Sequence, residues 1–193
     1  MARQELASGT VFVLGFPMAK RDNHYEAAFE AYLRSRQVPY VAVDETKRSL
    51  LSDGTLKSLD FIVTPRNLPH AWLVDVKGRR FPAGRQKQYW KNWTTGDELH
   101  SLARWEELLG GQFTGLLVFA FHIVGNFAPV PTEQLFCFRE RWYAFLAIRL
   151  HHYTAHAHVI SPKWDTRALA AAKFRELAEP IEALLGGPRA ACV

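Results

Sequence analysis

An acidic residue and a lysine stand two positions apart in Asp75-Val76-Lys77, directly after the apolar run Ala71-Trp72-Leu73-Val74. On a β-strand, residues at positions i and i+2 point to the same face, so the carboxylate and the ammonium group are expected side by side. A second acid, Asp60, adjoins the apolar residues Phe61-Ile62-Val63, which predict a neighbouring strand. Two carboxylates and a lysine at the tips of adjacent strands would form a site for a hard divalent cation, because such ions prefer oxygen ligands.

An acid two positions before a lysine is not specific by itself, because the pattern recurs in Glu45-Thr46-Lys47. That second copy belongs to a polar stretch without an apolar strand beside it. A purely structural explanation also remains open, in which Asp75 and Lys77 form an ion pair at the end of a strand and Asp60 forms a turn. It accounts for each residue separately but not for two acids at neighbouring strand tips, where they repel each other unless a positive charge lies between them.

Periodicity predicts the elements that must position these residues. Apolar residues at helical spacing from Tyr25 to Leu33 predict a first helix, capped by Asp22 or Asn23. Thr95 and Glu98 form a capping-box sequence that predicts a second helix, ending near residue 109 before two glycines. The other predicted elements are strands at 38–43, 58–64, 71–76 and 115–121, a polar turn at 49–55, a loop at 78–80, a short one-faced segment at 86–93, a hairpin of 135–138 with 142–150, and a final helix at 167–185 kinked at Pro180.

This order of helices and strands predicts an α/β sandwich around a mixed sheet. Residues 115–121 are fully apolar and are therefore expected at the centre of the sheet. The chain of 193 residues is long enough for a substantial core and short enough for one domain. We expect a single domain over residues 1–193, with its core at about 22–150 and a C-terminal helix at about 167–185.

The three pieces that carry the acids and the lysine resemble the PD-(D/E)xK nuclease superfamily, also called restriction-endonuclease-like. They are a first helix with glutamates in His24-Tyr25-Glu26-Ala27-Ala28-Phe29-Glu30, a strand with Asp60, and a strand with Asp75-Val76-Lys77. The resemblance covers about residues 22–122, and a glutamate on the first helix is typical of its resolvase-like branch. It implies a three-layer α/β/α fold with a central mixed β-sheet, and a Mg²⁺- or Mn²⁺-dependent nuclease that hydrolyses phosphodiester bonds in DNA.

The resemblance also implies roles for the residues at the strand ends. Asp60, Asp75 and the main-chain carbonyl of Val76 would bind the metal ion, which needs only a few protein ligands. Lys77 would orient the attacking water, help to deprotonate it and offset negative charge in the transition state.

On the first helix, Glu26 is the better candidate for holding a second ion or a metal-bound water. It lies closer to the apolar face of the helix than Glu30, which is placed further toward solvent and is the reserve candidate. Glu26 also lies three positions after Asn23, so closing a capping box is an alternative role.

Residues after Lys77 add candidates for the same site. Gln86 is one, because a glutamine after the lysine contributes to the site in several branches of the superfamily. Four basic residues near the proposed metal would bind DNA phosphates, or else form a solvated loop: Arg79, Arg80, Arg85 and Lys87.

Two other groups of residues suggest different chemistry. Four histidines within eight positions would suit a transition metal, but no acid or cysteine accompanies them locally; contact with nucleic acid or a plain surface role stays open (His151, His152, His156 and His158). Trp90 and Trp93 lie near the basic segment and would stack on bases.

Composition narrows the class of protein. The net charge of +5 and pI of about 9.4 lean toward a polyanionic partner such as DNA. The two cysteines show no disulfide or metal spacing, which fits a reducing cytoplasm. The longest apolar stretch, 116–124, is about half a membrane span, so we expect no membrane partner.

The alternative function is a catalytically inactive module on the same fold that binds nucleic acid or protein. For a nuclease that cuts two strands, a homodimer is natural, and a partner protein is the other source of specificity.

Overall fold

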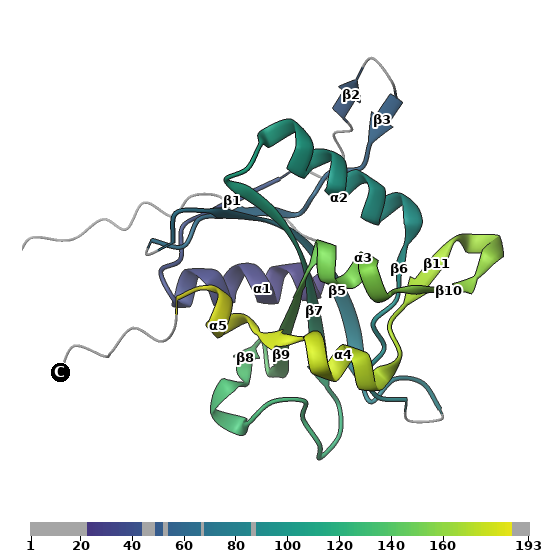
Figure 1. Cartoon of the computed structure of the whole chain (residues 1–193). Helices are drawn as coiled ribbons and strands as arrows, with labels where there is room; N and C mark the ends of the chain where they lie inside the picture. The colour runs from purple at the N-terminus through teal and green to yellow at the C-terminus, as the bar shows by residue number, and fades with distance from the viewer. Residues whose placement is uncertain (1–22, 44–48, 52–53, 67, 86–87, 187–193) are drawn as a thin grey trace, which may run out of the picture.

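The structure is a computed structural model that describes residues 23–43, 49–51, 54–66, 68–85 and 88–186. Its main strands are β1 (Tyr40–Ala42), β4 (Phe61–Val63), β5 (Ala71–Phe81), β7 (Phe113–Ile123), β8 (Phe136–Phe138), β9 (Arg141–Arg149) and β12 (Glu179–Pro180). They form a seven-stranded sheet in the order β1-β4-β5-β7-β9-β12, with β8 paired to β9 (Figure 1). β5 and β7 are parallel over their whole length, and the other neighbours are antiparallel, so the sheet is mixed.

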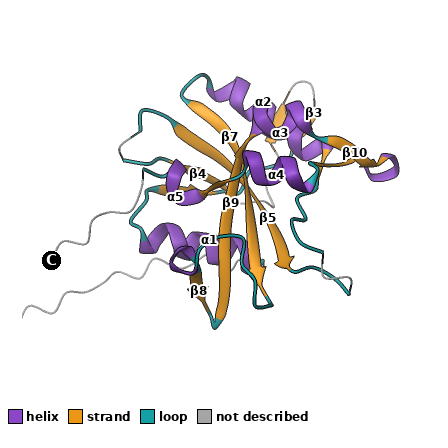
Figure 2. Ribbon diagram, turned by 60° about the horizontal axis from the view of Figure 1, so that its bottom comes forward, coloured by secondary structure: helices purple, strands orange, loops and turns teal. Residues whose placement is uncertain are grey.

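Helices cover both faces of this sheet (Figure 2). One face carries α1 (His24–Ser35) and α5 (Ile181–Leu184), and the other carries α2 (Gly96–Leu109), α3 (Leu150–His156) and α4 (Ala171–Leu177). The predicted three-layer α/β/α fold with a central mixed sheet is confirmed. No helix in the described part of the chain is long and apolar enough to cross a membrane.

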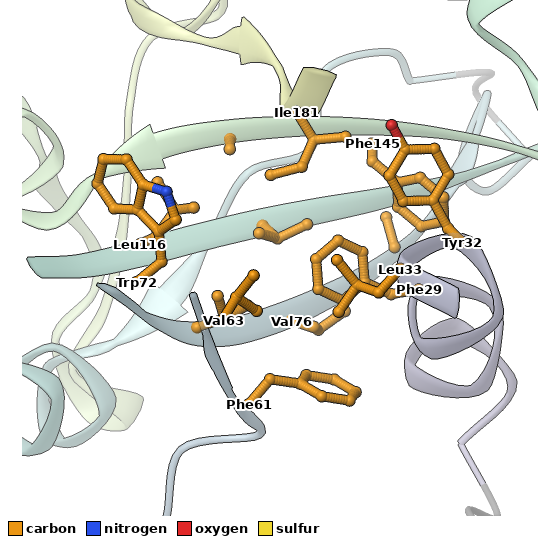
Figure 3. Close-up of a cluster of buried hydrophobic side chains, with 14 of the residues drawn as sticks. Phe29, Tyr32, Leu33, Phe61, Val63, Trp72, Val76, Leu116, Phe145 and Ile181 are labelled. Atoms are coloured by element: carbon orange, nitrogen blue, oxygen red, sulfur yellow. The ribbon is translucent and has the colours of Figure 1, made fainter. Parts of the chain in front are cut away.

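Aromatic packing fixes α1 against the sheet (Figure 3). Phe29 of α1 is fully buried, and its ring lies edge-on to Phe61 of β4 and Phe145 of β9, with centroids 5.5 and 5.3 Å apart. Such edge-to-face pairs add about 0.5–1.5 kcal/mol each to the burial of the rings. The helix begins where predicted, because the side chain of Asn23 accepts the N–H of Tyr25 as its N-cap.

Two local predictions in the second half are also confirmed. The capping box of Thr95 and Glu98 begins α2, and Gly110, with a φ of 84°, follows its last residue. The predicted hairpin is formed by β8 and β9, and its turn places Arg139 and Glu140 at φ values of 49° and 61°.

The strand that carries Asp75 and Lys77 is longer than predicted. The strand predicted at 71–76 is confirmed, but the loop predicted at 78–80 was wrong, because β5 continues to Phe81 and pairs with β7 at every position. The polar character of Gly78-Arg79-Arg80 suggested a loop, but these residues lie at the end of the sheet where polar side chains are tolerated. The turn predicted at 49–55 was also wrong in its described residues, because β2 (Ser49–Leu51) and β3 (Gly54–Leu56) pair as antiparallel strands.

The predicted final helix at 167–185, kinked at Pro180, was wrong. This segment contains the end of β11 (Thr166–Ala168), then α4, β12 and α5, with β12 added to the edge of β9. Phe174 packs on the α2 face of the sheet, whereas Ile181 and Leu184 pack on the α1 face. The chain therefore crosses the edge of the sheet between α4 and α5, and it does so in the extended β12 rather than at a kink within one helix.

Short elements complete the described structure. β11 lies between β10 (His158–Ser161) and β6 (Thr94–Thr95) in a small antiparallel sheet. Two 3₁₀ turns occupy Thr132–Gln134 and Pro162–Trp164. Within the described residues of the 86–93 segment the chain is not helical, and Trp90 has a φ of 62°.

Candidate active site

A cavity of about 540 Å³ opens at the edge of β5 beside the start of β4. On β5, the pairing with β4 covers only Trp72–Val74, and the following residues from Asp75 to Arg79 line this cavity. Side chains reach it from α1 on one face of the sheet and from α2 on the other. Five of the residues predicted to be catalytic or to bind the metal line it, together with one residue that was not predicted: Glu26, Asp60, Asp75, Val76 and Lys77, and the unpredicted Glu98.

Asp60 is joined to β5 by both its main chain and its side chain. Its N–H donates to the carbonyl of Val74 at 2.9 Å, and its Oδ2 accepts the N–H of Val76 at 2.5 Å. A strand residue directs its N–H and C=O to the same edge, so the carbonyl of Val76 points toward the same side as Asp60. The two acids were predicted at the tips of adjacent strands. Instead, Asp60 lies just before β4 and Asp75 lies in the middle of β5.

Lys77 lies between two carboxylates. Its Nζ is 2.7 Å from Oδ2 of Asp75 and 3.0 Å from Oε1 of Glu98, and its side chain is only 10% exposed. Burial alone would lower the pKa of Lys77, but the two carboxylates outweigh it and raise that pKa. The predicted pairing of Asp75 and Lys77 on one face of the strand is thus present, and the arrangement favours the charged ammonium group.

Glu98 is the residue that sequence reasoning missed at this site. Its Oε2 accepts the N–H of Thr95 at 2.9 Å and the hydroxyl of Thr94 at 2.6 Å, while its Oε1 contacts Lys77. Burial would raise the pKa of Glu98, but Lys77 and the two threonine donors lower it to about 2. The capping-box sequence already explained the presence of this glutamate, so no nearby residue indicated that its other oxygen would contact Lys77.

The glutamates of α1 differ in their positions. Glu26 is buried, lines the cavity and accepts a hydrogen bond from the side-chain amide of the N-cap residue Asn23. Glu30 was expected further toward solvent, but it is buried against Arg34 and Tyr40, with contacts of 2.6 and 2.8 Å, outside the cavity lining. The reserve candidate is therefore not brought to the site.

α1 approaches β5 closely at Gly78. A Cβ atom at this position would lie 2.2 Å from the ring of Tyr25, so no larger residue fits while the helix stays in place. Tyr25 also lines the cavity, next to Glu26. The glycine therefore sets the distance between the helix that carries Glu26 and the strand that carries Lys77.

The predicted phosphate-binding residues occupy different environments. Arg79 is not in a loop: it lines the cavity, donates to the carbonyls of Gly78 and Trp93, and lies 4.0 Å over the Trp93 ring. Arg80, at the end of β5, and Arg85 are exposed. Gln86 and Lys87 lie outside the described residues, and Trp90 packs against Phe81 and Phe174.

The cavity offers few oxygen ligands for a magnesium-like ion. Among the described residues, no group of three or more histidine, cysteine, aspartate or glutamate side chains is arranged to hold a metal, which includes the four histidines at 151–158. The cavity instead offers the carboxylates of Asp60 and Asp75 and the carbonyl edge of Val76. Mg²⁺ is commonly held by one or two carboxylates with several waters, so this donor set is compatible with it.

No family model matches the chain, and no curated protein matches it. Among solved structures, it is similar to Hjc, a Holliday junction resolvase from the hyperthermophilic archaeon Archaeoglobus fulgidus. The match has 9% sequence identity and a TM-score of 0.49, and covers 84% of this chain and 98% of the resolvase.

Proposed function

We propose that this protein is a metal-dependent nuclease that hydrolyses phosphodiester bonds in DNA. The observation that carries the proposal is the convergence of Asp60, Asp75, Lys77 and Glu26 on one cavity from three separate elements. A structural ion pair would explain Asp75 with Lys77, but it would not require Asp60 and Glu26 at the same opening. The resemblance of the sequence to the PD-(D/E)xK superfamily supports the same function.

In this proposal, Asp60, Asp75 and the carbonyl of Val76 hold the metal ion. When bound there, Mg²⁺ or Mn²⁺ would activate water and offset charge on the phosphate. Lys77 presents its ammonium group to the phosphate oxygens, and Glu98 keeps that group in place from the side of α2. Glu26 faces the same space from α1 and would orient a water or a second ion.

Cleavage of labelled duplex, single-stranded and branched DNA, with Mg²⁺ or Mn²⁺ and with EDTA, tests the proposal. We expect cutting by the wild type that requires the metal and is lost in Asp75→Asn and Lys77→Met. Asp97→Asn is the matched control, because Asp97 is exposed in the first turn of α2 and does not line the cavity. Circular dichroism would establish that the variants are folded.

The outcome also separates the nuclease from its alternative. Binding of DNA without cutting under either ion would favour a catalytically inactive binding module. Cutting that persists in both folded variants would place the chemistry elsewhere.

A further inference from the structure

Beyond the cavity, polar and aromatic side chains form a continuous row across three strands. Arg80 of β5 is the register partner of His122 of β7, which is the partner of Tyr143 of β9. Register partners project from the same face, and neighbouring strands lie about 4.8 Å apart, so these side chains form one row. Arg141 extends the row, because it lies two positions before Tyr143 on the same face of β9.

His24, the first residue of α1, joins this row to the helix. One of its ring nitrogens shares a hydrogen bond of 2.8 Å with the Tyr143 hydroxyl, and its ring centroid is 5.8 Å from that of His122. The rings of His122 and Tyr143 are stacked at 5.5 Å. We name His24, Arg80, His122, Arg141 and Tyr143 the strand-end row.

The strand-end row has a positive electrostatic environment. Burial lowers the pKa of both His24 and His122, and Arg141 lowers both further, with Arg80 also acting on His122. Near neutral pH the imidazoles therefore serve as uncharged hydrogen-bonding groups, and Arg80 and Arg141, both exposed, carry the charge. Exposed arginines beside polar rings match the groups that contact phosphates in nucleic-acid complexes.

The strand-end row begins where the cavity ends. Gly78 and Arg79, immediately before Arg80, line the cavity, and so does Tyr25, whose ring centroid is 3.9 Å from that of His24. The row also lies at the carboxyl ends of the parallel strands β5 and β7, a common place for ligands in α/β proteins.

We propose that the strand-end row binds the sugar-phosphate backbone of the nucleic-acid strand whose phosphate enters the cavity, without reading its bases. This inference rests on the proposed nuclease function and adds the surface that holds the substrate beside the cut. The contacts come from Arg80 and Arg141 as charged donors and from the half-buried His24 and His122 as neutral ones. Tyr143 is fully buried and holds His24 in place through its hydroxyl. Each arginine should contribute its own phosphate contact.

The test is the salt dependence of DNA binding, measured by fluorescence anisotropy in EDTA so that metal-dependent cutting does not interfere. Each phosphate contact contributes about 0.9 to the slope of log K against log salt on duplex DNA and about 0.7 on single strands. The double variant Arg80→Gln/Arg141→Gln should therefore lose about 1.8 of slope on duplex and about 1.4 on single-stranded DNA. The matched control is Arg66→Gln/Arg104→Gln, which removes the same charge from the β4–β5 loop and from α2, where Arg104 pairs with Glu107.

The slopes of the variant and of its control decide whether the proposal holds. A loss of slope in the strand-end variant with an unchanged control supports the proposal. The proposal is overturned by any of three results: equal slopes in wild type and variant, an equal loss of slope in the control pair, or no DNA binding by the wild type. Cleavage assays on the same preparations separate the two proposals. If the wild type cuts DNA but the slopes are unchanged, only the proposal for the strand-end row is refuted. If the slope falls as expected but the wild type does not cut, only the proposed nuclease function is refuted.

Discussion

Glu98 of α2 and Lys77 of β5 are joined across the cavity, with Oε1 of the glutamate 3.0 Å from Nζ of the lysine. The other oxygen of the same carboxylate accepts the N–H of Thr95 at the start of α2. The position of the ammonium group and the beginning of the helix therefore depend on one side chain. A substitution that keeps the second function and removes the first can separate them.

Glu98→Gln is such a substitution, because glutamine also closes a capping box but carries no charge for Lys77. We expect a loss of about 2 kcal/mol in the free energy of unfolding, the scale of a hydrogen bond to a charged group. Cleavage should fall about ten- to a hundredfold as the ammonium group loses its fixed position. Urea unfolding and single-turnover cleavage measure the two effects. Thr95→Ala is the control: it should cost about 1 kcal/mol through the cap and leave cleavage near the wild-type rate.

The stabilisation from Glu98 should depend on acid pH. Its pKa is lowered from 4.5 to about 2 in the folded protein, so unfolding is accompanied by proton uptake between these values. The contribution is present in full above about pH 5 and is lost as the pH falls toward 2. The difference in urea midpoint between wild type and Glu98→Gln should therefore be constant from pH 5 to 7 and shrink below pH 4.5. A difference that stays constant down to pH 3 would contradict this assignment.

Gly78→Ala should push α1 away from β5. The new methyl group would meet the Tyr25 ring, whose nearest atom lies 2.2 Å from the ideal Cβ position. Overpacking of this kind costs about 1–3 kcal/mol, and the same substitution should cost less in a Tyr25→Ala background. A double-mutant cycle by urea unfolding measures this coupling. Gly111→Ala serves as a control, because a Cβ there meets no atom within 4 Å.

Divalent ions should stabilise the wild type through Asp60 and Asp75. An ion that binds only the folded state adds about 1.4 kcal/mol for each tenfold rise in its concentration above Kd. Thermal unfolding with increasing Mn²⁺ or Mg²⁺, against an EDTA reference, should show a rising midpoint for wild type and Asp97→Asn. The double variant Asp60→Asn/Asp75→Asn should show no such rise; an equal rise would place the ion at another site.

Much of the fold could be predicted because its signals are local. The Asn23 cap, the capping box of α2 and the β8–β9 turn are each specified by residues close together in the chain. The apolar run of β7 likewise predicted a central strand, and β7 lies between β5 and β9.

Two errors in the predicted fold came from contacts between distant segments. The sequence of the second half of β5 suggests a loop, and its strand conformation depends on pairing with β7. The sequence at 167–185 suggests one helix, but part of it forms β12 because it pairs with β9. The same reason hid Glu98 from the site prediction. Its cap is local, but its contact with Lys77 exists only once α2 lies on the sheet.

The cavity brings together the carboxylates of Glu26, Asp60, Asp75 and Glu98 with the basic groups of Lys57, Lys77 and Arg79. With all of them charged, its lining carries a small excess of negative charge, which opposes the entry of a phosphodiester. A divalent cation reverses that excess, so the ion and the nucleic acid should bind cooperatively, each raising the affinity for the other by the same factor. The acidic lining thereby lets the ion strengthen the binding of the substrate as well as support the cut.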